Sequence, residues 1–556
     1  MTATGAQVIA SFIESLGVEH VFGVGGANIE DLFLAVQQRR PRLTAILAKH
    51  EHAAGTAADA YARLRRSIGV VMVTSGGGAL NLTAALGEAM ASRVPVLAIV
   101  GEPPTALQGR GAFQDTSGVS GAVDVRVAFG ALSVWCERVR RADDLPVTLA
   151  AAARAAWQRQ GPAVLLVAKD VQQATTAESA ITAAVPDAST RHEWDAAGID
   201  RALELLRTGA SVIIAGDEVA RADARAELTA FAQALGAPVA VTPDARDAFD
   251  NGDSSFVGVA GAMGHEEAAT ALAESPVWVL VGTRLPLLAR TGHESLLAGK
   301  ALLALSSDAP FVSGATTLHV DGSLQQNLRA LTAGLDPAVV TRPPRRPPAG
   351  PVRLEVTNGP LTSAAALGLV QRVIPDDAVV LIDAGNTGAQ AVHHLAAPRD
   401  GRWLVAMGMA GMGYTFGAAV GAACATGRRC FVFAGDGAFY MHGLDIHTAV
   451  QHHLPITYVI FNNRAHGMCL VRERLLLGEV AGYNEFGPAS IGRGLHAMFP
   501  ALPAADCGTG EQLSEALQHL SGVDGPAAVC VELDEVETPP FVAFRIAAAA
   551  AQGERR

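Results

Sequence analysis

Short apolar runs alternate with helix-length amphipathic segments along most of the chain. The runs are rich in Val, Ile and Leu and are bounded by Gly or Pro, which is typical of strands buried on both faces of a parallel sheet. Between the runs, apolar residues recur at helical spacing, as at Val8, Phe12 and Leu16. This pattern predicts an α/β protein made of doubly wound parallel sheets.

The predicted strands form three groups, separated by two stretches of different composition. They cover residues 20–24, 70–74, 94–100 and 163–168, then 212–215, 239–241 and 277–281, and finally 379–382, 429–434 and 455–461. The stretch 174–190 is rich in Ala and Thr. The stretch 337–351 contains clustered prolines, which favour an extended connector and exclude a helix. We therefore predict three domains, at residues 1–175, 190–336 and 354–556, and the first and third look like two versions of one architecture.

Composition and charge restrict the class of protein. A chain of 556 residues is too long for one core, and half of its residues are apolar. Its net charge of -12 and the lack of a basic stripe argue against nucleic acid or an anionic membrane as a partner. No apolar run is long enough to span a bilayer, and the amino terminus has no basic segment followed by an apolar one. Neither membrane insertion nor secretion is therefore expected.

The six cysteines are scattered along the chain without CxxC spacing. Cys430 and Cys530 lie in strand-like runs, where we expect buried, reduced thiols. Reduced thiols are typical of the cytoplasm, so a cytoplasmic protein is predicted.

Two polar motifs follow neighbouring predicted strands. A Gly-Asp436-Gly segment comes after the strand 429–434, a helical stretch covers 441–453, and an Asn-Asn463 pair comes after the strand 455–461. A strand-helix-strand unit crosses over right-handedly, which places Asp436 and Asn463 at the carboxyl ends of adjacent parallel strands. Each motif alone is commonly a turn or a helix cap. Together they predict a site for Mg²⁺ and a diphosphate, since Mg²⁺ prefers such oxygen ligands.

At this spacing, the two motifs resemble the thiamine diphosphate-binding motif of the acetolactate synthase and pyruvate decarboxylase superfamily. The resemblance implies that Mg²⁺ is bound by Asp436, Asn463 and the backbone carbonyl of Ala465. It also implies that the three domains are a pyrimidine-binding, a central and a diphosphate-binding domain. Further implied cofactor contacts come from Asn81, Gly385, Asn386, Thr387, Gly435, Gly437, Ala438, His466, Gly467 and Met468.

The segment 49–63 resembles the HE-x-x-A…GYAR pattern of the same superfamily, with Glu51 as its glutamate. The resemblance implies that Glu51 contacts N1′ of the cofactor's aminopyrimidine. There its carboxyl group exchanges a proton and so turns the neighbouring 4′-imino group into a base. The alternative is a surface glutamate that opens a helix, a position favoured by the helix dipole.

The segment 408–421 resembles the superfamily's glycine-rich turn that leads into a helix. The resemblance implies that Met412 wedges between the two rings of the cofactor and that the Ala410 carbonyl accepts from the 4′-amino group. The alternative for Met412 is an ordinary core methionine.

The expected substrate pocket mixes features of two enzymes. The turn at 22–28 resembles the FGxPGG turn of acetolactate synthases without its proline, and also the version in benzaldehyde lyase, which has a histidine in place of Asn28. Arg472 falls where the synthases carry an acceptor-selecting tryptophan, which favours an anionic acceptor, although a solvated arginine is the equal alternative. The expected pocket residues are Gly26, Ala27, Phe113, Gln114, Met468 and Arg472, and the candidate catalytic residues are Glu51, Asn28, Gln114, His442 and His466.

We therefore expect a thiamine diphosphate- and Mg²⁺-dependent carboligase that decarboxylates a 2-keto acid, pyruvate being favoured, and joins the acyl unit to a second carbonyl. The alternatives are a non-decarboxylating lyase and a catalytically silent paralogue. FAD in the central domain is not favoured, since 282–292 is only loosely similar to the FAD segment of acetolactate synthases. In the superfamily the cofactor spans two chains, which implies a homodimer at minimum and favours a homotetramer.

Overall fold

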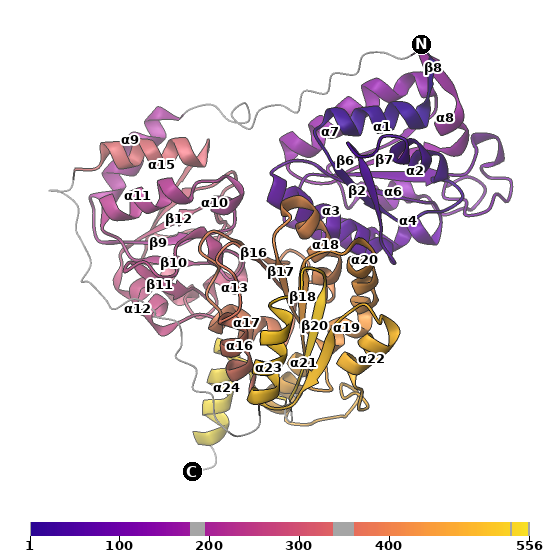
Figure 1. Cartoon of the computed structure of the whole chain (residues 1–556). Coiled ribbons are helices and arrows are strands. Elements are labelled where there is room, and N and C mark those ends of the chain that lie inside the picture. The colour runs from indigo at the N-terminus through magenta and orange to yellow at the C-terminus, as the bar shows by residue number, and fades with distance from the viewer. Residues whose placement is uncertain (1, 178–194, 337–360, 534–535, 554–556) are drawn as a thin grey trace.

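The computed structural model describes residues 2–177, 195–336, 361–533 and 536–553 (Figure 1). These residues form three six-stranded sheets in which every pair of adjacent strands is parallel. The prediction of an α/β protein with three doubly wound sheets is confirmed. Both predicted connectors lie largely outside the described residues.

The N-terminal sheet has the strand order β3-β2-β4-β5-β7-β6. Its strands are β2 (His20–Gly23), β3 (Thr44–Leu47), β4 (Gly69–Val73), β5 (Val96–Glu102), β6 (Trp135–Val139) and β7 (Ala163–Ala168). The main helices of this domain are α1 (Gly5–Ser15), α2 (Glu30–Gln37), α3 (Glu51–Arg65), α4 (Gly77–Asn81), α5 (Thr83–Ala91) and α7 (Leu145–Arg159). The predicted connector 174–190 begins instead with β8 (Thr175–Ala177), which pairs antiparallel with β1 (Thr2–Thr4). The first residues of the predicted linker are therefore part of a two-stranded sheet, and the rest of it, from residue 178, lies outside the described residues.

The central sheet has the order β11-β10-β9-β12-β13-β14. Its strands are β9 (Ser211–Ala215), β10 (Val239–Val241), β11 (Phe256–Val259), β12 (Val277–Val281), β13 (Ala301–Leu305) and β14 (Thr316–Val320). Its main helices are α9 (Ala196–Leu206), α10 (Glu218–Arg221), α11 (Arg225–Leu235), α12 (Glu266–Glu274) and α15 (Leu324–Gly334).

The C-terminal sheet has the order β16-β15-β17-β18-β20-β19. Its strands are β15 (Val379–Ile382), β16 (Arg402–Val405), β17 (Cys430–Gly435), β18 (Ile456–Asn462), β19 (Ala504–Cys507) and β20 (Ala527–Glu532). Counted along the chain, the order second, first, third, fourth, sixth, fifth is the same in the N-terminal and C-terminal sheets. The expectation of two versions of one architecture is therefore confirmed.

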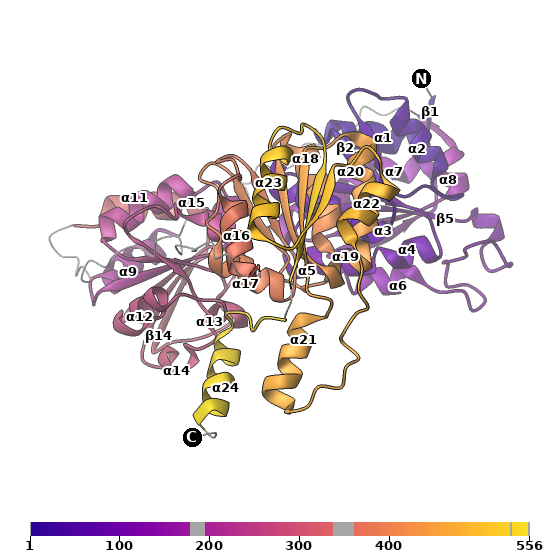
Figure 2. The same ribbon diagram turned by 60° about the horizontal axis from the view of Figure 1, so that its bottom comes forward.

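Helices cover both faces of the C-terminal sheet, which explains why its strands are mostly apolar. The main helices are α16 (Ser363–Gln371), α17 (Asn386–His394), α18 (Tyr414–Thr426), α19 (Asp436–His442), α20 (Ile446–His452), α21 (Gly467–Arg472), α22 (Ile491–Met498) and α23 (Gly510–Leu520). In Figure 2, α16 and α23 lie on one face and α18 and α20 on the other. Along β17, Val432 packs into one core and Phe433 into the other.

The predicted helix at 441–453 has different bounds in the structure. Helix α19 begins directly after β17, and a 3-10 turn at Gly443–Asp445 separates it from α20. The carboxylate of Asp445 in this turn accepts a hydrogen bond of 2.9 Å from the backbone N–H of Lys49. A contact with the N-terminal domain thus interrupts a stretch that the local pattern predicts as continuous.

The N-terminal and C-terminal domains meet along α3 and α18 (Figure 1). Two glycines of α18 allow the close approach, because a Cβ on Gly417 would lie 2.3 Å from the Ala53 carbonyl oxygen and one on Gly421 would lie 1.9 Å from that of Ala57. This packing fixes the start of α3, and Glu51 with it, relative to the C-terminal domain.

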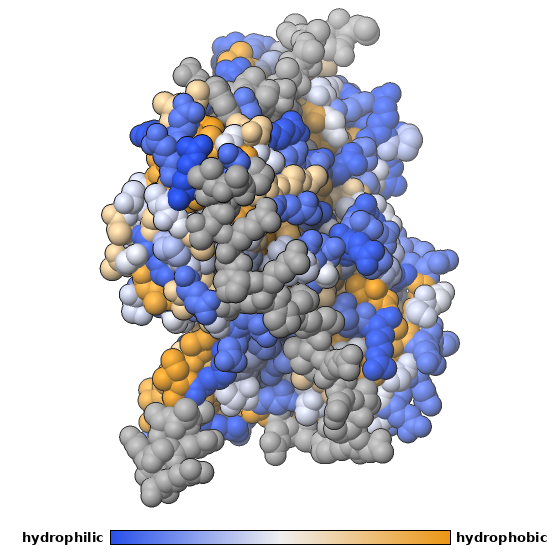
Figure 3. All heavy atoms as spheres, turned by 90° about the vertical axis from the view of Figure 1, so that its left-hand side faces the viewer, coloured by the Kyte–Doolittle hydropathy of each residue, from blue (hydrophilic) through white to orange (hydrophobic). Residues whose placement is uncertain are grey.

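No helix in the described residues has both the length and the hydropathy needed to cross a bilayer. The face shown in Figure 3, which includes the central domain, carries hydrophilic side chains interspersed with smaller apolar areas.

Candidate active site

Asp436 and Asn463 lie at the same edge of the C-terminal sheet. Asp436 is the first residue of α19 and directly follows β17, whereas Asn463 directly follows β18. These strands are parallel neighbours, with Gly435 opposite Phe461. The predicted convergence of the two motifs is therefore present.

Asp436 as a residue is only 1% exposed. Burial raises its pKa to about 6, although the backbone N–H groups of Gly437, Arg464 and Ala465 act in the opposite direction. Its Oδ2 atom is buried and has no hydrogen-bond partner among the described residues. A buried carboxylate with an unpaired oxygen is costly unless a cation binds it, so this donor set fits Mg²⁺. Beside it, Asn463 Oδ1 accepts from the backbone N–H of Ala465 at 3.2 Å.

Gly437 allows two side chains to approach the start of α19. A Cβ at this position would lie 2.7 Å from His466 Nδ1 and 3.0 Å from Met412 Cε. The Nδ1 atom of His466 is buried without a hydrogen-bond partner in the described part of the chain, and the ring meets Phe486 edge-on at 4.7 Å. Met412, His466 and the Gly-Asp-Gly segment therefore form one wall.

The start of α17 lies beside the Asp436 and Asn463 motifs. Gly385 precedes this helix with φ +106°, and a Cβ on it would meet no atom within 4 Å. A Cβ on Gly467 would lie 2.8 Å from Asn463 Nδ2 and 2.9 Å from Asn386 Nδ2, which brings these amides together. Asn386 Oδ1 is buried and unpaired among the described residues, while Thr387 Oγ1 lies 3.4 Å from the position of a Cβ on Gly435. The first N–H groups of a helix have no partner within the helix, so those at the start of α17 suit a phosphate.

Ala438 and Met468 complete the set of residues expected around the diphosphate. Ala438 is fully buried on α19, and Met468 on α21 is partly buried against the core of the C-terminal domain. Both lie on helices that begin beside the Asp436 and Asn463 motifs.

The glycine-rich turn lies next to this wall. Ala410 has a left-handed conformation with φ +52°, and a Cβ on Gly411 would meet no atom within 4 Å, so the turn faces open space. Met412 is half-buried and packs against the core, so part of its side chain behaves as the alternative reading expects.

Glu51 is the first residue of α3 and is 8% exposed. Asn81 Nδ2 donates to its Oε2 at 2.9 Å. A Cβ on Gly78 would lie 2.9 Å from Oε1, so the first turn of α4 needs a glycine at that position to leave room for the carboxylate. The alternative reading is correct that Glu51 opens a helix and wrong that it lies at the surface.

The Asn28 and Gln114 side chains gather around the strand end after β4. Asn28 is 5% exposed, and its Nδ2 donates to Ser75 Oγ at 2.7 Å. The Thr74 hydroxyl donates to Gln114 Oε1 at 3.5 Å. A Cβ on Gly76 would lie 2.8 Å from Gln114 Cβ, so Gln114 also packs against this strand end. This strand end is the same one that leads to Gly78 beside Glu51.

Other expected pocket residues are less enclosed in the single chain. Gly26 packs against Thr74, and a Cβ on it would lie 2.7 Å from Thr74 Cβ. Ala27 is exposed, and Phe113 is 75% exposed. Arg472 is exposed at the end of α21, where its Nε donates to the Met468 carbonyl at 3.4 Å.

His442 belongs to a cluster of three histidines at the meeting of the two domains. Its ring stacks on His52 at 4.1 Å and meets His50 at 5.3 Å. Burial, together with the neighbouring imidazoles, lowers the pKa of His52 to about 3, and burial also lowers the pKa of His442. Both rings are therefore neutral near pH 7.

Two buried carboxylates beside the glycine-rich turn have no role in the sequence-based prediction. Asp383, at the end of β15, accepts from the Gly413 N–H at 2.8 Å, and Glu88 accepts from the Met409 N–H at 2.6 Å. The signal in the sequence is an acidic residue in an otherwise apolar segment, since such a residue is rarely buried without partners.

Three family models match the chain. They are the N-terminal thiamine pyrophosphate-binding domain of thiamine pyrophosphate enzymes over residues 3–120, the central domain over 199–331 and the C-terminal thiamine pyrophosphate-binding domain over 383–531. Each model falls on one of the three sheets.

Several relatives are similar over most of the chain. The large subunit of acetolactate synthase isozyme 1 of Escherichia coli (strain K12) is 27% identical over 96% of this chain and 94% of its own length. The large subunit of isozyme 2 from the same organism is 26% identical over 96% of each chain. The acetolactate synthase large subunit of Corynebacterium glutamicum is 28% identical over 84% of this chain and 76% of its own length. The chain therefore belongs to the thiamine pyrophosphate-dependent enzymes, and among them it is similar to the acetolactate synthase large subunits.

Proposed function

We propose that this protein is a carboligase that removes CO₂ from a 2-keto acid, pyruvate being favoured, and joins the remaining acyl unit to a second carbonyl compound. The observation that carries the proposal is the similarity to acetolactate synthase large subunits over 96% of the chain. The buried Glu51 and Asp436 carboxylates, one in each of the cofactor-binding domains, support it.

Thiamine diphosphate, when bound, supplies an electron sink for the acyl carbon. Glu51 would hold and return a proton at N1′ of the aminopyrimidine, as a general acid and base. Asn81 orients the carboxyl group through its 2.9 Å hydrogen bond, and burial keeps bulk water from competing for the proton.

Asp436, Asn463 and the Ala465 carbonyl would hold Mg²⁺, and Asn386, Thr387 and the first N–H groups of α17 would bind the diphosphate. The unpaired Oδ2 of Asp436 supports the metal site. The Oδ1 atom of the neighbouring Asn386, which has no hydrogen-bond partner among the described residues, supports a polar ligand beside the ends of β17 and β18.

Gln114 and Asn28 would contact the substrate. The amide of Gln114 would donate to the substrate carbonyl or to the alkoxide that develops there. His442 and His466 would move protons during bond formation. Burial lowers the pKa of His442, which leaves its imidazole neutral and free to accept a proton near pH 7 but makes it a weaker base.

Products of pyruvate with a panel of aldehydes and keto acids, identified by mass spectrometry with simultaneous measurement of CO₂, test the proposal. A carboligase releases CO₂ in step with a new acyloin or acetohydroxy acid. The second candidate is the non-decarboxylating lyase, which the missing proline in the turn at 22–28 favours, although Asn28 replaces the histidine of benzaldehyde lyase. Acyloin cleavage without CO₂ release from any keto acid would replace the first proposal by the second.

Arg472 is proposed to select an acceptor that carries an extra negative charge. In Arg472→Trp, the ratio of kcat/KM for a dicarboxylic keto acid to that for a small apolar one is expected to fall about tenfold, because a charge-assisted contact is lost. Arg474→Trp is the matched control, since Arg474 is also exposed and lies two residues further on. Equal ratios in the Arg472→Trp variant and the wild type would mean that Arg472 is only a solvated arginine.

We further propose that a homodimer is the smallest active unit, with a homotetramer as a pair of dimers. Exposed apolar side chains support this, because they flank the candidate site residues of both domains. They include Leu80 beside Asn81, Met409 beside Ala410, and Tyr440, Met441 and Leu444 on and after α19. A second copy that covers them would bring its Glu51 to the Asp436 site of the first.

Mixed dimers test this arrangement directly. A hybrid of one Glu51→Gln chain and one Asp436→Asn chain, isolated with two affinity tags, is expected to regain about half of the wild-type activity, because one of its two shared sites contains both native carboxylates. Activity per hybrid no higher than that of the two parent variants would contradict sites shared between chains.

A cytoplasmic location is proposed on the basis of the cysteines. All six are free thiols. Burial raises the pKa of Cys136 and Cys424 to about 12, so these thiols stay protonated and unreactive in a reducing compartment.

A further inference from the structure

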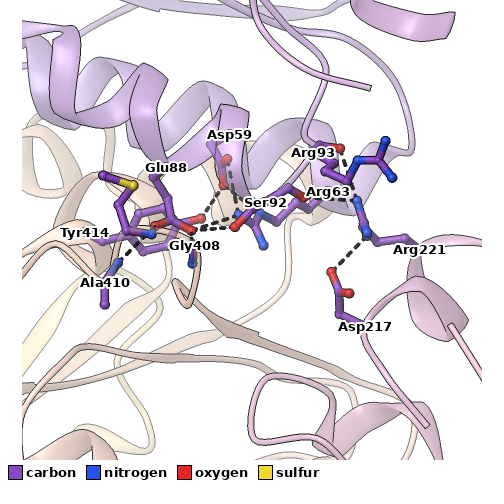
Figure 4. A network of polar contacts seen from close by, with 11 residues as sticks. Asp59, Arg63, Glu88, Ser92, Arg93, Asp217, Arg221, Gly408, Ala410 and Tyr414 are labelled. Carbon is purple, nitrogen blue, oxygen red and sulfur yellow. Dashed lines mark hydrogen bonds and ion pairs between the residues drawn. The ribbon is translucent and has the colours of Figure 1, made fainter. Parts of the chain in front are cut away.

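Glu88, on α5 of the N-terminal domain, holds the glycine-rich turn of the C-terminal domain (Figure 4). Its carboxylate is 4% exposed and accepts hydrogen bonds from three consecutive backbone N–H groups, those of Gly408 at 3.1 Å, Met409 at 2.6 Å and Ala410 at 3.2 Å. Three successive N–H groups that converge on one anion fix the conformation of the backbone that carries them.

The charges around Glu88 explain why the turn is held strongly. Arg63 Nε donates to Asp59 Oδ1 at 2.7 Å, and Arg63 Nη2 lies 3.6 Å from Glu88 Oε1. Both Asp59 and Glu88 are buried, so two carboxylates face one guanidinium and one negative charge remains in excess. The three N–H groups of the turn and the Ser92 hydroxyl, at 2.6 Å from Glu88 Oε1, compensate that charge.

The far end of the same turn is fixed by Asp383. Its carboxylate accepts from the N–H groups of Gly413 at 2.8 Å and Thr415 at 3.1 Å. Between the two carboxylates, Ala410 adopts φ +52°, a left-handed conformation that is unfavourable for an alanine and persists only where neighbouring contacts enforce it. The turn is therefore clamped at both ends, and its middle faces open space beside Gly411.

We propose that Glu88 is a positioning residue for the cofactor: its carboxylate fixes the turn that presents the Ala410 carbonyl and the Met412 side chain to the aminopyrimidine end of thiamine diphosphate. The proposal rests on the proposed function and on the roles that the resemblance to the superfamily implies for Ala410 and Met412. The N-terminal domain would then contribute two residues to cofactor binding. Glu88 would order the C-terminal domain of the same chain, and Glu51 would act in the proposed site shared with a second copy.

The test compares Glu88→Gln with the wild type in two measurements. Glutamine keeps the size of the side chain and one acceptor oxygen but loses the charge that gathers the three N–H groups. In the cofactor-free protein, amide hydrogen exchange in a peptide covering residues 406–412 is expected to be at least about tenfold faster, with exchange in β17 as the internal reference. The Kd for thiamine diphosphate with Mg²⁺, followed by tryptophan fluorescence, is expected to rise about tenfold or more.

Two further variants separate positioning from a general loss of structure. Glu88→Asp keeps the charge and is expected to restore at least part of both properties, even if Glu88→Gln does not fold. Glu266→Gln, at an exposed glutamate that opens α12, is the matched control and should leave both unchanged.

Each outcome decides the proposal. Unchanged exchange at 406–412 in Glu88→Gln would overturn the proposal, because other contacts would then hold the turn. Faster exchange with an unchanged Kd for thiamine diphosphate would also overturn it, because the order of the turn would then not affect cofactor binding. Equal defects in Glu88→Asp and Glu88→Gln would also overturn it, since charge would not be the cause. A wild-type protein that binds no thiamine diphosphate would refute the proposed function and this cofactor role, whereas the exchange measurement would still report whether Glu88 holds the turn.

Discussion

Glu51→Gln is expected to lower turnover about a thousandfold while changing the Kd for thiamine diphosphate by less than about threefold. Glutamine retains an oxygen that can accept the hydrogen bond from Asn81, so the variant keeps the local packing beside Gly78. It cannot release or take up a proton, and the exchange at N1′ is lost. Initial rates of product formation and a fluorescence titration of the cofactor measure the two effects separately.

The matched control for this prediction is Glu30→Gln. Glu30 is also the first residue of a helix in the N-terminal domain, α2, but it is exposed. The Glu30→Gln variant should retain the wild-type rate of turnover. A Glu51→Gln enzyme within about fivefold of the wild type would remove Glu51 from the reaction, because loss of a general acid or base costs at least about a hundredfold.

Asp436→Asn is expected to have opposite effects on binding and on stability. Without the negative charge, Mg²⁺ is no longer held beside the diphosphate, and the Kd for thiamine diphosphate at about 1 mM Mg²⁺ should rise at least about a hundredfold. The metal-free protein should become more stable near pH 7 by about 1–3 kcal/mol, because burial raises the pKa of Asp436 to about 6 and its ionised form opposes folding.

The pH dependence has a definite sign. A carboxyl group whose pKa is higher in the folded state than in the unfolded chain binds more protons in the folded state. The contribution of Asp436 to stability therefore falls as pH rises from the pKa of the unfolded chain to the folded-state pKa of about 6, and it stays low at higher pH. Urea unfolding in the presence of a chelator, at pH 5 and pH 7.5, should therefore show a gain for Asp436→Asn that is larger at pH 7.5.

Asp445→Asn is the control for the binding measurement, since burial also raises the pKa of Asp445 to about 6 while its oxygen accepts from Lys49. It should leave the Mg²⁺ dependence of cofactor binding unchanged. If Asp436→Asn binds the cofactor at the same Mg²⁺ concentration as the wild type does, the metal is held elsewhere.

Strands and the convergence of the two motifs are predictable from the sequence because they depend on local pattern and on the handedness of the crossover. The strands predicted at 429–434 and 455–461 are shifted by one residue in the structure, to Cys430–Gly435 and Ile456–Asn462. The helix predicted at 441–453 fails because the turn at Gly443–Asp445 depends on a contact with Lys49, far away in the chain. No local pattern contains that contact.

The order of apolar runs and the spacing of a few polar residues determined the fold class and the cofactor of this protein, because both follow from features within a few dozen residues. Only the tertiary structure decided that Glu51 is buried beside Gly78 of α4, that one oxygen of Asp436 has no hydrogen-bond partner among the described residues, and that Glu88 holds a turn 320 residues further along the chain. Desolvation and hydrogen-bond partners are set by whichever atoms the folded chain brings together, and the sequence order does not display them.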